Sequence, residues 1–316
     1  MSSLRGLRRA ASVLLLGAAL VFLSWSLLEL GEEVAFRDAV PGTGAMLLAA
    51  LLSVGWLATM AAGWIWVLRF HTNVSALPKI SVLLSAFMRA FLSRYVPGKV
   101  WPALVLWERL HGALGASPVI RSYLLQQIHL VASAGVLSVG ALPLVLSRVE
   151  NDLPMAGISI GLAVAVGLTW ALMPKPFFSF AHRWAPPKWR EHLIFQGSID
   201  RWALGFGIFV LVGVFQGAAV IPLWQAVAEP DHQLDLAGMV AVVCAYAAAR
   251  IVGQGVAVVP AGIGVREGVF VLLVSGLSRE AALISVLWLR LIATVVEALV
   301  WAASARLAGR DVRRDR

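Results

Sequence analysis

The feature that most constrains this chain is a series of apolar blocks, each about 20 residues long and almost free of charge. An α-helix of that length crosses the ~30 Å hydrocarbon core of a lipid bilayer. Hydrophobic residues make up 60% of the 316 residues and charged residues only 14%, against roughly 25% charged in soluble domains. The sequence therefore predicts an all-α, polytopic transmembrane helical bundle, in which residues 1–316 form a single integral membrane domain.

The distribution of the charged residues excludes other classes of protein. A net charge of +9 would suggest nucleic-acid binding in a soluble protein, but here the Lys and Arg residues lie between or inside the apolar blocks and form no basic face. Nucleic acid is therefore not expected as a partner. The single cysteine, Cys244, lies in an apolar block, so neither a disulfide framework nor a metal cluster is expected. No cofactor is expected either.

Six segments have the length and composition of clear spans: 10–28, 45–68, 123–146, 155–173, 203–227 and 281–307. Two further apolar segments, at 80–106 and 236–277, are interrupted by Pro and Gly. We expect each to form a re-entrant hairpin or a broken helix, which needs surrounding protein or a water-filled cavity at membrane depth. The second is also long enough to span, so six to eight transmembrane helices are predicted.

The charges of the loops predict how the chain is oriented. Basic residues concentrate in the N-terminus, after the second span, in 174–201 and in the C-terminal tail, whereas the intervening loops are acidic or neutral. Because Lys and Arg favour cytoplasmic loops, we expect both termini in the cytoplasm and 174–201 as a cytoplasmic surface loop. The two interrupted segments then enter from opposite faces. An inverted repeat of halves 1–150 and 151–316 would produce this arrangement, and two unrelated loops are the alternative.

Charges inside the apolar segments give the candidate site. The bases are Arg89, Arg94, Lys99, Arg250, Arg266 and Arg290, and the acids are Glu267 and Glu297. An ionised side chain near the membrane centre costs ~2.5–3.5 kcal/mol, so such residues normally face a cavity. Two acids cannot neutralise six bases, and the excess positive charge predicts a site for an anion. In a membrane the natural anion is a lipid phosphate.

We therefore expect the six bases to bind a headgroup phosphate and the two acids to balance charge or to gate access. Helix-breaking residues would turn backbone amides toward the cavity; they are Pro97, Gly98, Pro260, Gly262 and Gly264. Two alternatives stay open for the charges: cations near segment ends can snorkel to the interface, and Glu297 can form a structural ion pair across helices. His129, beside Gln126 and Gln127, is interpreted as a polar packing residue or as a proton sensor.

The stretch SRYVPGKVW, followed by PAGIGVREG, resembles the two signature stretches of the lysylphosphatidylglycerol synthase transmembrane family, also called the flippase-like domain family. The matching residues are Arg94, Tyr95, Pro97, Gly98, Lys99 and Trp101, then Pro260, Gly262, Gly264, Arg266, Glu267 and Gly268. The resemblance covers nearly the whole chain. It implies a multi-pass protein of the bacterial or archaeal cytoplasmic (inner) membrane that translocates lipids, such as aminoacylated phosphatidylglycerol, hopanoids or polyprenyl-linked glycolipids. Synthase members add a soluble aminoacyl-transferase domain after the membrane region, so we do not expect synthase activity from a chain ending at Arg316.

Together these observations predict a lipid flippase that binds an anionic phospholipid or a polyprenyl-phosphate-linked lipid in a cationic intramembrane cavity, and not an enzyme. The sequence contains no H-E-x-x-H zinc pattern and no Walker loop. One alternative is a non-transporting partner or scaffold of a cell-envelope synthesis enzyme. A second is a membrane-embedded lipid or glycosyl transferase, which the scarcity of acids in 108–121 and 174–201 disfavours.

Overall fold

The structure, a computed structural model, describes residues 40–314 except for 73, 75, 97–99, 140–165, most of 168–197, 256–261 and 263. Within these described residues the secondary structure is helical and contains no strand. The longer helices are α2 (Thr43–Phe70), α5 (Ala116–Val139), α10 (Ile199–Ala218), α12 (Leu236–Gly255) and α13 (Val265–Arg314). The shorter ones are α3 (Ile80–Leu92), η1 (Ser93–Tyr95), α4 (Trp101–Leu114), α11 (Ile221–Val227) and η3 (Pro230–His232).

Five of the described segments are long and apolar enough to cross a membrane, which identifies a multi-pass helical membrane protein. The predicted span 45–68 corresponds to α2, and 203–227 corresponds to α10 followed by α11. The helix that corresponds to the span expected at 123–146 begins earlier, at Ala116, and residues 140–146 lie outside the described residues. The predicted spans at 10–28 and 155–173 lie outside the described residues.

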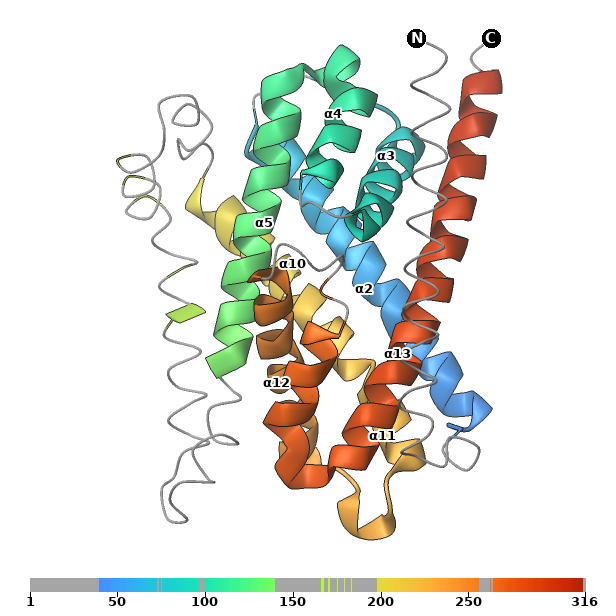
Figure 1. Ribbon diagram of the computed structural model, residues 1–316. Helices are drawn as coiled ribbons and strands as arrows, with labels where there is room; N and C mark the ends of the chain where they lie inside the picture. The colour runs from blue at the N-terminus through green and yellow to red at the C-terminus, as the bar shows by residue number, and fades with distance from the viewer. Residues whose placement is uncertain are drawn as a thin grey trace.

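The first interrupted segment forms a helical hairpin of α3, η1 and α4, which we call the first hairpin. Its α3 has 13 residues and is about 20 Å long, too short to cross a bilayer core. Pro102 lies in the first turn of α4, where a helix needs no backbone donor. Both helices occupy the upper half of the bundle in Figure 1, and α5 then descends from the upper end.

The second hairpin is formed by α12 and the first part of α13, residues 265–277. Ser278 interrupts α13 with extended backbone (φ −168°, ψ 116°), and its Oγ accepts the N–H of Ala281 at 3.2 Å. This is the geometry of an N-cap, so the chain starts a new helix there. That helix continues past the predicted span 281–307 to the opposite end of the bundle (Figure 1).

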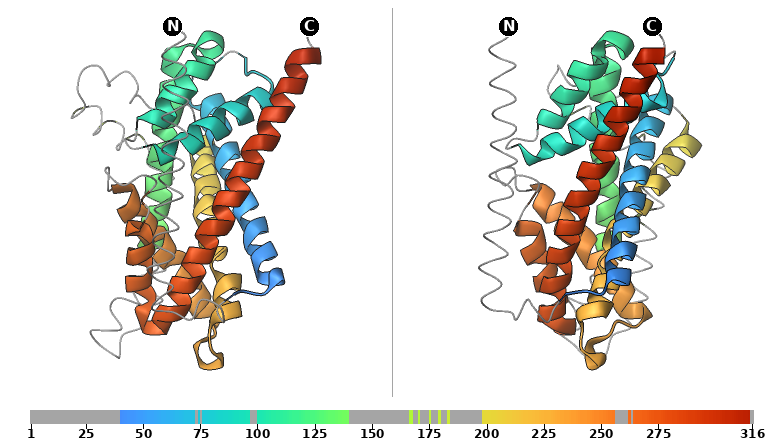
Figure 2. Two further views of the ribbon diagram at one scale, coloured as in Figure 1. Left: turned by 45° about the vertical axis from the view of Figure 1, so that its right-hand side comes forward. Right: turned by 90° about the vertical axis from the view of Figure 1, so that its right-hand side faces the viewer.

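The two hairpins enter the bundle from opposite ends. The first lies in the upper half and the second in the lower half, and the interrupted end of each is near mid-height in all three ribbon views (Figures 1 and 2). Although α12 has the length of a full span, its C-terminal end therefore stops near the middle of the bundle. The interruptions predicted at 80–106 and 236–277 are thus both present.

Each hairpin packs into its own hydrophobic cluster. The first cluster surrounds α3 and α4 and includes Trp64, Phe87 and Leu106. The second surrounds α12 and the start of α13 and includes Trp224 and Phe270. Among the described helices, only α2 and α13 contribute buried residues to both clusters, so these two helices connect the halves of the bundle.

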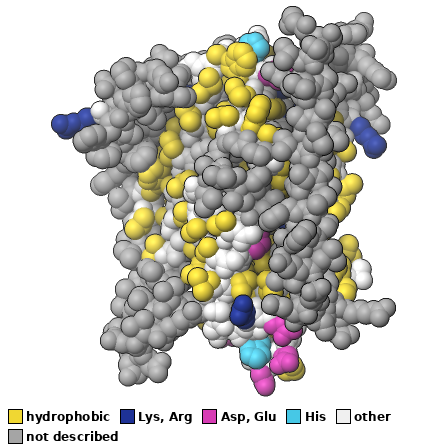
Figure 3. Space-filling view, in the orientation of Figure 1, with side chains coloured by type: hydrophobic (Ala, Val, Ile, Leu, Met, Phe, Trp, Pro, Cys, Tyr) yellow, Lys and Arg dark blue, Asp and Glu magenta, His cyan; other side chains and the backbone are white. Residues whose placement is uncertain are grey.

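The outer surface has the character of a membrane protein. Large hydrophobic side chains are exposed on most of the helices, among them Leu47, Leu51 and Leu272, each about two-thirds exposed. Figure 3 shows hydrophobic side chains over the described part of one face, with acidic side chains gathered at its lower end. The exposed loop around η3, with Glu229 and Asp231, supplies acids to the end that α11 and α12 share.

Candidate functional site

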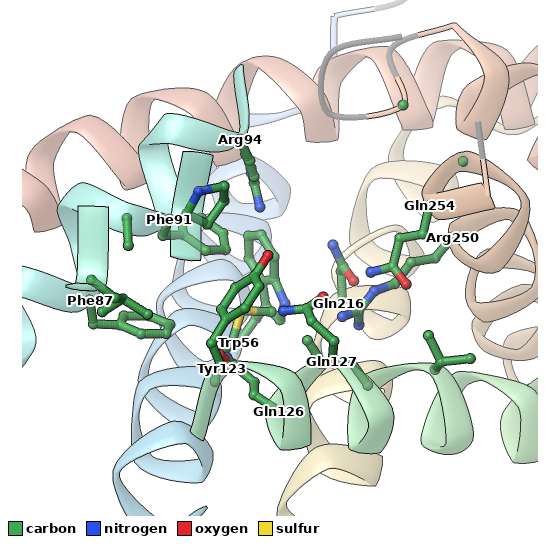
Figure 4. Close-up of a pocket in the computed structure, with 18 of the residues that line it drawn as sticks. Trp56, Phe87, Phe91, Arg94, Tyr123, Gln126, Gln127, Gln216, Arg250 and Gln254 are labelled. Atoms are coloured by element: carbon green, nitrogen blue, oxygen red, sulfur yellow. The ribbon is translucent and has the colours of Figure 1, made fainter. Parts of the chain in front are cut away.

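A cavity of about 450 Å³ opens between the two hairpins, near the middle of the bundle (Figure 4). Its lining residues come from α2, both helices and η1 of the first hairpin, α5, α10, α12 and the start of α13. One part of the wall is aromatic and aliphatic, with Trp56, Phe87, Phe91, Leu106 and Leu130. The other part is polar, with Arg94, Arg250, Arg266, Gln126, Gln127, Gln216 and Gln254. The cavity therefore suits an amphiphilic ligand with a charged end.

Arg94 joins the first hairpin to the last helix. Its Nη2 donates to Glu297 Oε1 at 2.5 Å, and Tyr95 donates its hydroxyl hydrogen to Glu297 Oε2 at 2.9 Å. The guanidinium also lies over the ring of Phe91, 3.8 Å from its centroid, in a cation–π contact. Glu297 is 2% exposed, whereas the side chain of Arg94 keeps 25% of its surface exposed. Arg94 is thus held by a buried carboxylate while its other side faces the cavity.

Glu267 organises the charges of the second hairpin. Its Oε1 accepts hydrogen bonds from Arg266, with Nη2 at 2.8 Å, and lies 3.5 Å from Arg290 Nη1. Its Oε2 accepts the backbone N–H of Gly264 at 2.8 Å, so the side chain also caps the start of α13. One carboxylate therefore serves two arginines and one backbone donor. We expected the amide of Gly264 to face the cavity, but it donates its hydrogen bond to Glu267 instead.

Arg250 differs from the other arginines of the cavity. It is 6% exposed, and among the described residues it has no carboxylate partner and its Nη1 has no hydrogen-bond partner, whereas Arg94, Arg266 and Arg290 each lie beside a glutamate. In Figure 4 its guanidinium points into the cavity beside the side chains of Gln216 and Gln254. A buried donor without a partner is costly, and a buried cation without a counter-ion more so. Arg250 is therefore the group of the cavity that most needs an anionic ligand.

The remaining predicted site residues separate into three groups. Gly262 lines the large cavity, and Arg290 and Glu297 line a smaller adjoining space together with Arg94 and Arg266. Arg89 lines neither space and instead lies near Arg109 of α4. The structure thus places Arg89 away from the predicted anion site, because it lies on a different face of α3 from Phe87 and Phe91. Pro97, Gly98, Lys99 and Pro260 lie outside the described residues.

Gly262 has a structural reason to be glycine. Its φ is +67°, in the left-handed region that favours this residue. A Cβ at this position would lie 3.0 Å from the backbone oxygen of Gly253. The residue thus lets the chain after α12 turn and approach that helix closely, which brings Arg266 to the cavity.

The glutamines and the aromatic wall were not predicted as part of the site. A signal was available in the sequence: Gln126, Gln127, Gln216 and Gln254 each interrupt an apolar block. Uncharged polar groups at membrane depth also need partners, although they cost less to insert than charges. His129 is fully buried between Trp202 and Phe209, with ring centroids 4.0 Å and 5.2 Å away. This position matches the interpretation of His129 as a packing residue.

No protein-family model matches the chain, and comparison with curated proteins gives no match either. What the cavity can bind is therefore argued from its geometry and charge. Four buried or half-buried arginines, Arg94, Arg250, Arg266 and Arg290, lie around it against two glutamates, Glu267 and Glu297, which leaves a net charge of +2. Such a site can hold an anion with charge-assisted hydrogen bonds while the aromatic wall covers an apolar part of the same ligand.

Proposed function

We propose that this protein binds an anionic lipid in the cavity between its hairpins and moves it from one leaflet to the other. The observation that carries the proposal is Arg250, a buried guanidinium with an unpartnered donor facing a 450 Å³ cavity. A lipid phosphate supplies both the negative charge and the acceptor oxygens that this donor needs. The lipid is an anionic phospholipid or a polyprenyl-phosphate-linked lipid of the cytoplasmic membrane.

The arrangement of the hairpins supports movement as well as binding. Transporters built from inverted repeats place their sites at the interface of two discontinuous helical units near the membrane midplane. Here the hairpins approach mid-height from opposite ends, and each packs into its own hydrophobic cluster. With both termini in the cytoplasm, the first hairpin enters from the cytoplasm and the second from outside. Movement of one unit against the other would expose the cavity alternately to each leaflet.

A change of ion-pair partner at Arg94 would accompany this movement. Arg94 lines the cavity but is paired with Glu297 of α13, so a phosphate that enters competes with Glu297 for the same guanidinium. Exchange of Arg94 between Glu297 and the ligand would loosen the contact between the first hairpin and α13. In such an exchange Arg94 stays paired throughout, and Glu297 keeps the hydrogen bond from the Tyr95 hydroxyl when Arg94 leaves it.

The test compares lipid retention by the full chain and by two variants, Arg250→Gln and Arg89→Gln. Native mass spectrometry measures which lipids stay bound after purification from membranes that contain both anionic and zwitterionic phospholipids. We expect the wild type to retain anionic lipid, and Arg250→Gln to lose about 10- to 100-fold in affinity, because a charge-assisted hydrogen bond is removed. Arg89→Gln is the matched control, since Arg89 lies outside the cavity, and should retain lipid as the wild type does.

Movement is measured separately, in proteoliposomes that contain a fluorescent anionic phospholipid quenched from one side. The wild type should raise the rate at which the label crosses, and Arg250→Gln should not. Equal retention of anionic and zwitterionic lipid by the wild type contradicts the binding proposal. Binding that depends on Arg250 without any movement would instead support the non-transporting partner of an envelope-synthesis enzyme.

A further inference from the structure

Two unpartnered acceptors accompany the unpartnered donor of Arg250. The Oε1 atoms of Gln216 and Gln254 are buried and have no hydrogen-bond partner among the described residues. Both side chains line the same cavity as Arg250, and Figure 4 shows the three side chains close together, coming from α10 and α12. Gln126 and Gln127 of α5 add two more carboxamides to the cavity wall. This polar side therefore presents acceptors as well as donors.

A phosphate alone does not satisfy this set of groups. An ionised phosphate offers only acceptor oxygens, so it can pair with Arg250 but can donate nothing to Gln216 or Gln254. Buried acceptors left without a donor weaken binding, and sites that are built to hydrogen-bond a ligand hydroxyl discriminate strongly against ligands that lack it. The ligand must therefore carry hydrogen-bond donors next to its phosphate.

The charge of the cavity decides which donor fits. An ammonium group would donate hydrogen bonds but would lie among Arg94, Arg250 and Arg266, in a cluster with a net charge of +2. Like charges at close range in a low-dielectric site repel strongly. A hydroxyl donates without adding positive charge. Hydroxyls also suit the aromatic side of the cavity, because the C–H faces of a polyol can pack on Trp56 and Tyr123.

Resting on the proposed function, we propose that the ligand is a phospholipid with a hydroxyl-bearing headgroup, such as a polyol or a sugar. Its phosphate binds Arg250, and two of its hydroxyls donate to Gln216 and Gln254. The cavity, at about 450 Å³, is of a size that holds a small polar ligand. The headgroup therefore occupies the cavity while the acyl chains stay in the surrounding bilayer.

The test uses three short-chain phosphodiester lipids that differ only in the headgroup: dioctanoyl phosphatidylinositol, dioctanoyl phosphatidylmethanol and dioctanoyl phosphatidylethanolamine. Phosphatidylmethanol carries the same single negative charge as phosphatidylinositol but no hydroxyl on its headgroup. Binding to the purified full chain in detergent is measured by calorimetry. We expect phosphatidylinositol to bind about tenfold more tightly than phosphatidylmethanol, from two added hydrogen bonds, and phosphatidylethanolamine to bind most weakly.

The variants are Gln216→Leu and Gln254→Leu, which remove the acceptors while keeping a side chain of similar size. Each should weaken phosphatidylinositol binding roughly three- to tenfold and leave phosphatidylmethanol binding unchanged. Because Gln254 is less buried than Gln216, its variant provides the readout if Gln216→Leu does not fold. Gln233→Leu, in the exposed loop after η3, is the control and should bind all three lipids as the wild type does.

The outcomes separate the two proposals. Equal affinities for phosphatidylinositol and phosphatidylmethanol overturn the hydroxyl preference and leave the anionic-lipid site intact. A glutamine variant that weakens both anionic lipids equally also overturns the preference, because its effect is then on the shape of the cavity. If neither anionic lipid binds better than phosphatidylethanolamine, the proposed function itself fails.

Discussion

The two hairpins enter the bundle in similar ways but use their arginines differently. In the first hairpin, Arg94 is paired with Glu297, a carboxylate that belongs to the distant last helix. In the second, Arg266 is paired with the adjacent Glu267, and Arg250 has no carboxylate partner among the described residues. The first hairpin thus contributes a cation that holds two parts of the fold together. The second hairpin pairs one of its arginines internally and leaves the other, Arg250, without a carboxylate partner among the described residues.

This difference shows why corresponding positions in two related-looking segments need not share a role. Each arginine lies next to an interrupted helix end, so sequence position alone gives them equal weight. Their roles depend on where the nearest carboxylate lies, and that is set by the packing of α13 across both hairpins. Three predictions test this comparison, in order of decreasing effect on stability.

The largest effect is expected for Glu267→Gln. The substitution removes the carboxylate shared by Arg266 and Arg290 while keeping an oxygen that can accept the N–H of Gly264. Removal of one partner from a buried ion pair typically costs about 3–5 kcal/mol. We expect a marked fall in the thermal unfolding midpoint of the detergent-purified chain. Glu229→Gln, in an exposed pair with His232, should change little, and an unchanged midpoint for both variants would show that Glu267 is not a stabilising partner.

Glu297→Gln should destabilise less, by about 2–3 kcal/mol, because Arg94 is a quarter exposed and keeps its contact with the Phe91 ring. The same substitution frees Arg94 for a ligand. We therefore expect dioctanoyl phosphatidic acid to bind about two- to tenfold more tightly, as measured by calorimetry. Lower stability combined with tighter binding is the result that an exchange of partners predicts. Weaker binding would mean that Glu297 only positions the cavity wall and that Arg94 does not reach the ligand.

Gly262→Ala tests the close approach within the second hairpin. Its φ of +67° costs a non-glycine residue roughly 1–2 kcal/mol, and the added methyl would also meet the backbone oxygen of Gly253 at 3.0 Å. Gly264→Ala is the matched variant, since its φ is +81° but no atom lies within 4 Å of the added Cβ. Both should lower the unfolding midpoint, with the larger fall for Gly262→Ala. If the two variants lower the unfolding midpoint equally, the close contact with Gly253 adds nothing, and the positive φ alone explains the glycine at position 262.

Much of the site could be anticipated because buried charge is rare in membrane segments. Arg94, Arg250 and Arg266 were predicted from their positions in apolar segments, and all three line the cavity. Arg89 satisfied the same criterion but does not line it, since the criterion cannot tell which face of a helix points inward. The glutamines were missed because a search for charged residues passes over neutral polar groups, although the proposal of a hydroxyl-bearing ligand rests on the acceptors of Gln216 and Gln254.

The sequence by itself determined that the chain is a multi-pass helical membrane protein, that two of its segments are interrupted, and that its membrane segments carry excess positive charge. These properties are local, because the length of an apolar block, a Pro or Gly break and the count of charges are all written along the chain. Only the tertiary structure decided which arginine has a partner. Glu297 lies 203 positions from Arg94, and their pairing depends on the last helix crossing both hairpins, which no local pattern specifies.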